Sequence, residues 1–134
     1  MSKKSNLVTK LNKLNLAVSR LEVALKEPTT NVLAIDGTIQ RFEFTFELLW
    51  KTTKDALFID GIDETLPREI IKRAYAGKYI HDESLWLQML DDRNETSHTY
   101  NDESASKIYA NIKSYFPEIV RLTKYLNEKS KNIS

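Results

Sequence analysis

The chain has 134 residues, which is enough for one domain with a core of its own. Its 41% hydrophobic and 29% charged residues are typical of a globular protein, and the absence of cysteine excludes disulfides, thiolate nucleophiles and cysteine zinc sites. A net charge of +1 excludes a globally basic nucleic-acid binder, so any RNA contact needs a local basic patch.

Three glycines and three prolines leave little room for hairpins, which favours a mostly helical chain. No stretch approaches the roughly 20 apolar residues of a membrane-spanning helix. The first residues, Met1–Asn6, lead into a polar-interrupted stripe and not into the apolar run of a signal peptide. We therefore expect a cytoplasmic protein with no membrane association.

The first predicted helix carries one apolar stripe whose members recur at alternating steps of four and three residues. They are Leu7, Leu11, Leu14, Val18, Leu21 and Leu25. Glu27–Thr30 ends this helix, because proline cannot continue the hydrogen-bond ladder. Such regular spacing fits either the core of one protomer or a partner face.

A second helix is predicted from before Ile35 to about Phe58, closed by a turn at Asp60–Gly61. In its centre, Gln40–Lys51, apolar side chains occupy almost the whole circumference, which predicts burial on several sides. The charged Arg41, Glu43 and Glu47 cannot then all avoid burial, and a buried charge needs a partner. Arg93 is the candidate partner.

Two short helices follow. One is predicted to begin with Thr65 as N-cap and Pro67 in its first turn, and to end at Gly77–Lys78. The next opens at Asp82–Ser84. Its predicted apolar face is Leu85, Trp86, Met89 and Leu90. This face, or the leucine stripe of the first helix, is expected to form a dimer interface.

The last helix is predicted to begin after the capping residues 101–104, to kink near Pro117, and to leave a frayed tail at 127–134. Its apolar stripe repeats the four-three spacing of the first helix. Residues 1–134 therefore predict a single all-α domain, an antiparallel up-and-down bundle of four to five helices.

The stretch 91–100 differs from ordinary helix packing, because it places a fixed cation, an amide, an imidazole and a phenol within ten residues. These are Arg93, Asn94, His98 and Tyr100. Arginine binds phosphate in a bidentate fork, and histidine exchanges a proton near neutral pH. On an unbroken helix Arg93 and His98 would lie about 140° apart. They can share a ligand only if the helix breaks between them or if two copies of the chain contribute.

Residues 93–100 resemble the R-x4-H-x-Y motif of HEPN domains. The wider chain is similar to one HEPN branch, the nucleotidyltransferase substrate-binding protein family. Stretches that carry this similarity are Gln40–Lys51, Leu66–Glu69, Glu83–Asp92 and Tyr100–Asn101. The resemblance implies a homodimeric helical bundle in which two copies of the motif meet in a shared cleft. It also implies a partner protein, a minimal nucleotidyltransferase of the polymerase-β type.

The resemblance implies two alternative roles. In one, the chain is a metal-independent endoribonuclease toxin, neutralised when the partner adds AMP to Tyr100. His98 would then act as the general acid–base, Arg93 would hold the phosphate, and Asn94 would orient either of them. In the other, it is a non-catalytic subunit that binds RNA, a nucleotide or another substrate for the transferase. Neither role requires a cofactor. A helical bundle without any site is the third interpretation.

Several neighbouring residues are candidates for support. Glu43 and Glu47 lie one turn apart and fit either a cation site or, more simply, ionic pairing within the bundle. Asp92, like Asp91, would repel RNA unless it is paired. A local basic surface could come from Lys72, Arg73 and Lys78.

Overall fold

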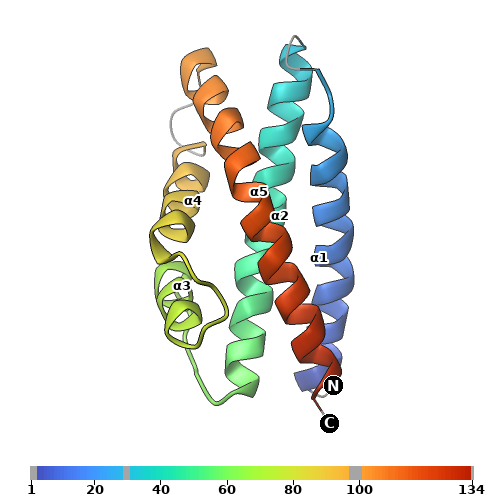
Figure 1. Ribbon diagram of the computed structural model, residues 1–134, viewed down its shortest axis with the longest axis vertical. Coiled ribbons are helices and arrows are strands. Elements are labelled where there is room, and N and C mark those ends of the chain that lie inside the picture. Colours follow the sequence, from blue (N-terminus) through green and yellow to red (C-terminus); the bar gives the residue numbers. More distant parts are fainter. Residues whose placement is uncertain (1–2, 29–30, 97–100, 134) are drawn as a thin grey trace.

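The computed structural model describes residues 3–28, 31–96 and 101–133. Within them are five α-helices: α1 (Lys3–Leu25), α2 (Val32–Ile59), α3 (Pro67–Ala76), α4 (Glu83–Thr96) and α5 (Asp102–Lys131). The long helices α1, α2 and α5 form three columns, and α3 and α4, stacked end to end, form the fourth (Figure 1). The columns alternate in direction, which confirms the predicted all-α up-and-down bundle.

Helix α2 is the central element, because it contacts each of the other four helices. It begins at an N-cap, Asn31, whose side chain accepts a hydrogen bond from the Leu33 N–H. It ends at Ile59 with Asp60 as C-cap, and Gly61 follows with a φ of 91°. Only glycine adopts this left-handed conformation without strain, so the predicted turn is confirmed.

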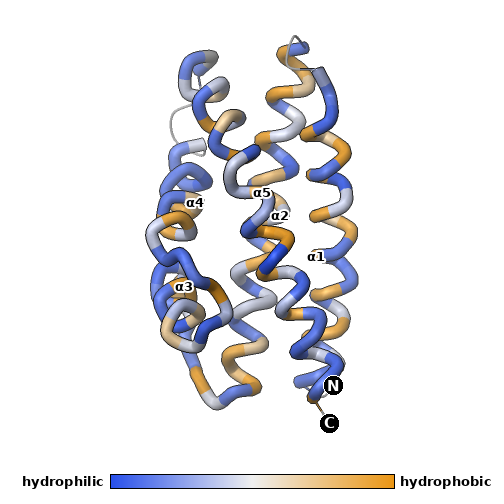
Figure 2. The backbone as a smooth tube through the Cα atoms, in the orientation of Figure 1, coloured by the Kyte–Doolittle hydropathy of each residue, from blue (hydrophilic) through white to orange (hydrophobic). Residues whose placement is uncertain are grey.

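The core is a continuous cluster along the bundle axis. Its aromatic part joins three elements: Phe42 stacks on Tyr115 of α5 at 6.0 Å between ring centroids, and Phe46 stacks on Trp86 of α4 at 6.4 Å. The leucines at 7, 11, 14 and 21 of α1 are buried in the same cluster. Along α1 hydrophobic and hydrophilic residues alternate, as expected of a helix with one buried face (Figure 2).

The structure corrects the expected dimer surfaces. The leucine stripe of α1 is used inside the protomer, and so are Trp86, Met89 and Leu90 of α4. Helix α2 is buried on several sides, as predicted, but Phe44 is an exception, because its residue surface is 61% exposed. Apolar composition alone did not separate the buried face of α2 from an aromatic residue that points to solvent.

Two helix ends differ from prediction. The N-cap of α3 is Leu66, not Thr65, and no side chain caps this end. Helix α5 continues past Pro117 and through most of the segment expected to fray, ending at Lys131. The tail stays ordered because it packs: Ser130 is buried and the Lys4 ammonium donates to the Ile133 carbonyl at 2.7 Å. Both ends of the chain therefore lie at the same end of the bundle (Figure 1).

Two leucine substitutions compare the buried face of α1 with its exposed face. We expect Leu14→Ala to lower the free energy of unfolding by about 2–5 kcal/mol, because it leaves a cavity in the core. Leu16→Ala, at a residue 52% exposed on the same helix, should change it by less than about 0.5 kcal/mol. Urea denaturation followed by circular dichroism measures both. Equal costs at the two positions would contradict the assignment of Leu14 to the core.

Candidate functional site

Arg93 lies in the last turn of α4 and faces α2. Its Nη2 atom is 3.5 Å from Oε2 of Glu47, and 29% of the Arg93 side chain is exposed. The expected ion pair between a carboxylate of α2 and Arg93 is therefore present. The guanidinium is held at the edge of the bundle and is not sealed in the core.

The Glu47 carboxylate also contacts two residues of its own helix. Trp50 Nε1 donates to Oε2 at 3.2 Å, and Lys51 Nζ lies 3.2 Å from Oε1. Partial burial alone would raise the pKa of Glu47, but these hydrogen bonds and the charges of Lys51 and Arg93 hold it below its usual value. Glu47 is thus ionised at neutral pH and can fix the position of Arg93.

Asp92 joins the end of α4 to α5. Its Oδ2 atom accepts hydrogen bonds from the Tyr115 hydroxyl at 2.5 Å and from Asn111 Nδ2 at 3.0 Å. Burial, and then the hydrogen bond and charge of Asp92, raise the pKa of Tyr115, so its hydroxyl stays protonated as a donor. The neighbouring Asp91 accepts from Arg68 of α3 at 3.1 Å. Both aspartates are therefore engaged in holding α4 in place, beside the arginine that the sequence singled out.

The other predicted site residues either make no described contact with Arg93 or lie outside the described residues. Asn94 is exposed, and as the next residue on the helix it points about 100° away from Arg93. Glu43 is half-buried one turn before Glu47, and no ion pair involves it within the described ranges. His98 and Tyr100 lie outside the described residues. The structure thus brings Arg93 and Glu47 together, with Asp92 as an anchor behind them.

Helix α4 ends at Thr96, and α5 begins after its N-cap, Asn101. Asn101 has an extended backbone, and its side chain accepts from the Ser104 N–H while the Ser104 hydroxyl accepts from the Asn101 N–H. On the other side, Thr96 Oγ1 donates to the Arg93 carbonyl at 2.7 Å, a local bond that competes with helix propagation. The described residues on the two sides of the motif are thus a helix end at Thr96 and a helix N-cap at Asn101.

The predicted basic surface of Lys72, Arg73 and Lys78 is partly neutralised. Two of the cations expected to form a basic surface face carboxylates: Arg73 is 3.1 Å from Glu64, and Lys72 is 3.9 Å from Glu69. No three potential metal ligands gather anywhere in the described part of the chain. No described helix combines the length and apolar character needed to cross a membrane.

Comparison with known proteins assigns the family. Residues 9–128 match the family described as "Nucleotidyltransferase substrate binding protein like". The chain belongs to this family. A relative from Haemophilus influenzae, named "Probable ribonuclease HepT", is 37% identical over 101 residues, which are 72% of this chain and 69% of the relative.

Two solved structures share the fold of this nucleotidyltransferase substrate-binding family member. HI0074 from Haemophilus influenzae, reported to reveal the fold of a substrate binding domain of a nucleotidyltransferase, superposes with a TM-score of 0.78 at 32% identity. The match covers 87% of this chain and 98% of HI0074. A protein from Thermus thermophilus superposes with a TM-score of 0.74 at 29% identity, over 89% of this chain and 99% of that protein.

Sequence reasoning missed two partners of Glu47, Trp50 and Lys51. The spacing could have revealed them, since residues three and four positions apart lie on the same face of a helix. It also missed the anchoring role of Asn111 and Tyr115, which lie 19 and 23 residues from Asp92 along the chain. No local pattern indicates such a contact between two helices.

The donors around Glu47 make the stability of this family member sensitive to acid. Because the pKa of Glu47 is lower in the folded state, its contribution is complete above the ordinary value of 4.5 and is lost as pH falls through the folded-state pKa. We expect stability to fall less between about pH 6 and pH 3 in Glu47→Gln than in the unsubstituted chain. Arg93→Gln should reduce the same pH dependence only in part, because Trp50 and Lys51 remain. Parallel pH profiles of urea denaturation for all three chains would contradict this.

Proposed function

We propose that this chain is the helical partner of a minimal nucleotidyltransferase of the polymerase-β type and acts as a metal-independent endoribonuclease. The family description and the solved domain HI0074 support the partnership with a transferase. The relative named as a probable ribonuclease supports the activity. Arg93 is the observation in this chain that carries the proposal.

Arg93 suits a phosphodiester in charge, shape and position. Its guanidinium is cationic at any physiological pH and offers a fork of N–H donors to phosphate oxygens. It lies at the surface, 29% exposed, where a strand can reach it. Its ion pair with Glu47, at 3.5 Å, holds the guanidinium at this edge of the bundle.

The proposed reaction needs only the strand and protein side chains. The RNA 2′-hydroxyl attacks the adjacent phosphorus, and the bond from phosphorus to the 5′-oxygen of the next nucleotide breaks. His98 moves the proton from the attacking hydroxyl toward the leaving oxygen. Arg93 stabilises the charge that develops on the phosphoryl oxygens, and Asn94 orients the histidine or the phosphate.

A homodimer is part of this proposal. The described residues place Arg93 at the end of α4, where the chain leaves the helix toward α5. Two copies that meet at this end would combine Arg93 of one protomer with His98 of either protomer in one cleft. Because the leucine stripe of α1 is buried, the contact between copies has to use other surfaces.

The nuclease is tested with purified chain and single-stranded RNA, in buffer with and without EDTA. We expect cleavage in both, and a loss on the order of 10²- to 10⁴-fold in His98→Ala because the proton transfer is removed. His81→Ala is the matched control, since this second histidine lies exposed between α3 and α4. Arg93→Ala should also abolish cleavage.

Two results would contradict the nuclease. RNA that stays intact with the unsubstituted chain would favour the alternative, a non-catalytic subunit that binds substrate for the transferase. Cleavage that survives in both His98→Ala and Arg93→Ala would show that the site lies elsewhere. Sedimentation of the same preparations at micromolar concentration tests the dimer, because a cleaving monomer is incompatible with a shared cleft.

Adenylylation of Tyr100 is the proposed regulation. A bulky anion next to Arg93 would compete with RNA for the guanidinium. After incubation with the partner transferase and ATP, we expect a mass gain of one adenylyl group on the peptide that contains Tyr100, together with loss of RNA cleavage. The modification should be absent in Tyr100→Phe and retained in Tyr75→Phe, at a tyrosine 47% exposed on α3. An unmodified Tyr100 in an active transferase mixture would contradict this regulation.

A further inference from the structure

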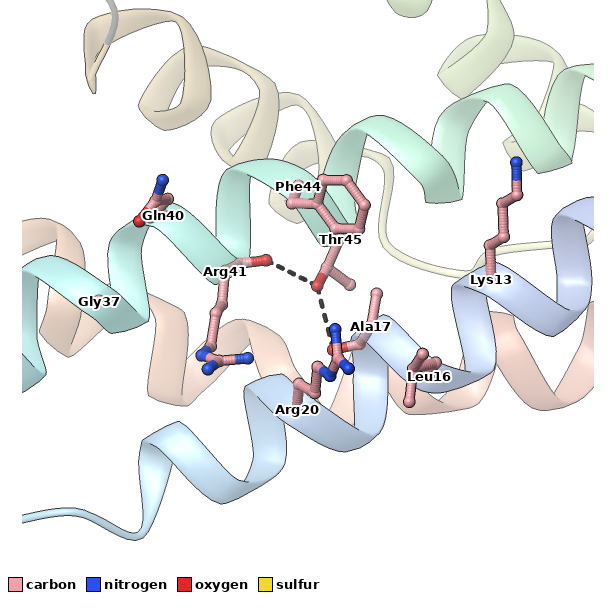
Figure 3. A pocket seen from close by; sticks show the side chains of 9 residues that line it. All are labelled: Lys13, Leu16, Ala17, Arg20, Gly37, Gln40, Arg41, Phe44 and Thr45. Atoms are coloured by element: carbon pink, nitrogen blue, oxygen red, sulfur yellow. Dashed lines mark hydrogen bonds between the residues drawn. The ribbon is translucent and has the colours of Figure 1, made fainter.

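A hollow with a volume of about 490 Å³ lies between α1 and α2. Three cationic side chains line it, Lys13 and Arg20 from α1 and Arg41 from α2, together with the amide of Gln40 and the ring of Phe44 (Figure 3). None of these residues belongs to the site at Arg93. The volume lies within the range of about 300–1,000 Å³ that is typical of small-ligand pockets.

The hollow exists because the two helices touch through small residues. Thr45 of α2 faces Ala17 of α1, and Thr38 faces Ala24 one heptad away. Each threonine hydroxyl donates at 2.7 Å to the carbonyl four residues earlier in α2 and lies 3.4 and 3.5 Å, respectively, from the facing carbonyl of α1. Gly37 adds no side chain, and a Cβ built on it would meet nothing within 4 Å. Small residues therefore form the bottom of the hollow, and long side chains from α1 and α2 form its two walls.

No carboxylate of the described residues lies within ion-pair distance of Lys13, Arg20 or Arg41. Arg68, Arg73, Arg93 and Arg121 each lie within ion-pair distance of a carboxylate. Arg20 and Arg41 form no such pair within the described ranges, although both extend from opposite helices into the same space (Figure 3). Glu27 borders the adjoining hollow without an ion pair to either. Two guanidinium groups that share one cavity repel each other unless an anion lies between them.

The exposed aromatic ring in the hollow indicates that the bound anion also carries a planar group. Phe44 is 61% exposed, and a planar base gains stacking energy on such a ring. Guanidinium forks match phosphate oxygens in geometry. The hollow fits a protein partner less well than a nucleotide. A stable protein interface buries at least about 1,000 Å², whereas the exposed apolar side chains that line this hollow are Phe44 and Leu16.

We propose that the α1–α2 hollow binds the phosphate of a nucleotide between Arg20 and Arg41, with its base against Phe44, either as a free nucleotide or within a single-stranded RNA. Lys13 adds a further cation along the hollow, and Gln40 is placed to contact the base or sugar edge. This is a second binding site, separate from the one that Glu47 and Arg93 form between α2 and α4. It stands whether or not the chain cleaves RNA.

The test uses the full chain and a fluorescent strand with 2′-O-methyl groups, which cannot be cleaved because the attacking hydroxyl is blocked. Fluorescence anisotropy gives Kd for the strand, and competition with AMP shows whether a free nucleotide suffices. We expect Arg20→Gln and Arg41→Gln each to raise Kd about tenfold or more, as loss of a hydrogen bond to a charged group would. Arg121→Gln, at an exposed arginine on α5, is the matched control and should leave Kd unchanged.

A steric pair of variants tests the cavity itself. Gly37→Leu fills the hollow and should abolish binding, whereas Gly37→Ala leaves it open and should not change Kd. Both substitutions favour the helix by up to about 1 kcal/mol relative to glycine, so misfolding does not confuse the comparison. Thermal unfolding by circular dichroism verifies that each variant is folded.

Three outcomes would overturn the proposal. One is unchanged Kd in Arg20→Gln and Arg41→Gln. A second is loss of binding only in Arg93→Gln, which would place all nucleic-acid contact at the first site. The third is a change in the sedimentation of the hollow variants with intact strand binding, which would make this surface a protein interface. Failure of the nuclease assay affects none of these measurements, because the strand is not cleavable and Arg93 is intact in the hollow variants.

Discussion

The position of Arg93 depends on one carboxylate of the central helix. Glu47 lies on α2, the element that contacts every other helix, and its own donors Trp50 and Lys51 keep it ionised. An arginine held by such a group is oriented while 29% of its side chain stays exposed.

Helix α4 carries two acidic residues immediately before Arg93, and unpaired carboxylates there would disfavour an RNA site. The structure uses both in holding the helix. Asp91 is bound by Arg68 of α3, and Asp92 is bound by Asn111 and Tyr115 of α5. These bonds fix the end of α4 against two neighbouring elements, so a hydrogen-bonded network on one side of the helix supports a partly exposed cation on the other.

The sequence predicted the fold well because helical periodicity and end signals are local. The stripes of α1 and α5, the turn at Gly61 and the capping residue Asn101 can all be read within a few residues. The ion pair of Glu47 with Arg93 was expected from the cost of burying charge on a crowded helix. Two inferences about which surfaces are covered were less successful. Burial of the centre of α2 on several sides did not reveal that Phe44 points to solvent, and of the two alternatives for the leucine stripe, core or partner face, the structure shows the core. The hollow at Arg20 and Arg41 was invisible in the sequence, since it depends on the alignment of Ala17 with Thr45. Of the motif, Arg93 and Asn94 are placed, and the proposed roles of His98 and Tyr100 rest on the sequence.

The chemistry assigned to Arg93 and His98 leaves a specific mark on the products. Attack by the 2′-hydroxyl predicts that each cleaved strand ends in a 2′,3′-cyclic phosphate and that the following fragment begins with a 5′-hydroxyl. Mass spectrometry of the fragments, combined with phosphorylation of the 5′ ends by a kinase, measures this directly. Fragments with 3′-hydroxyl and 5′-phosphate ends would mean that water attacked the phosphorus, and that result would contradict the account.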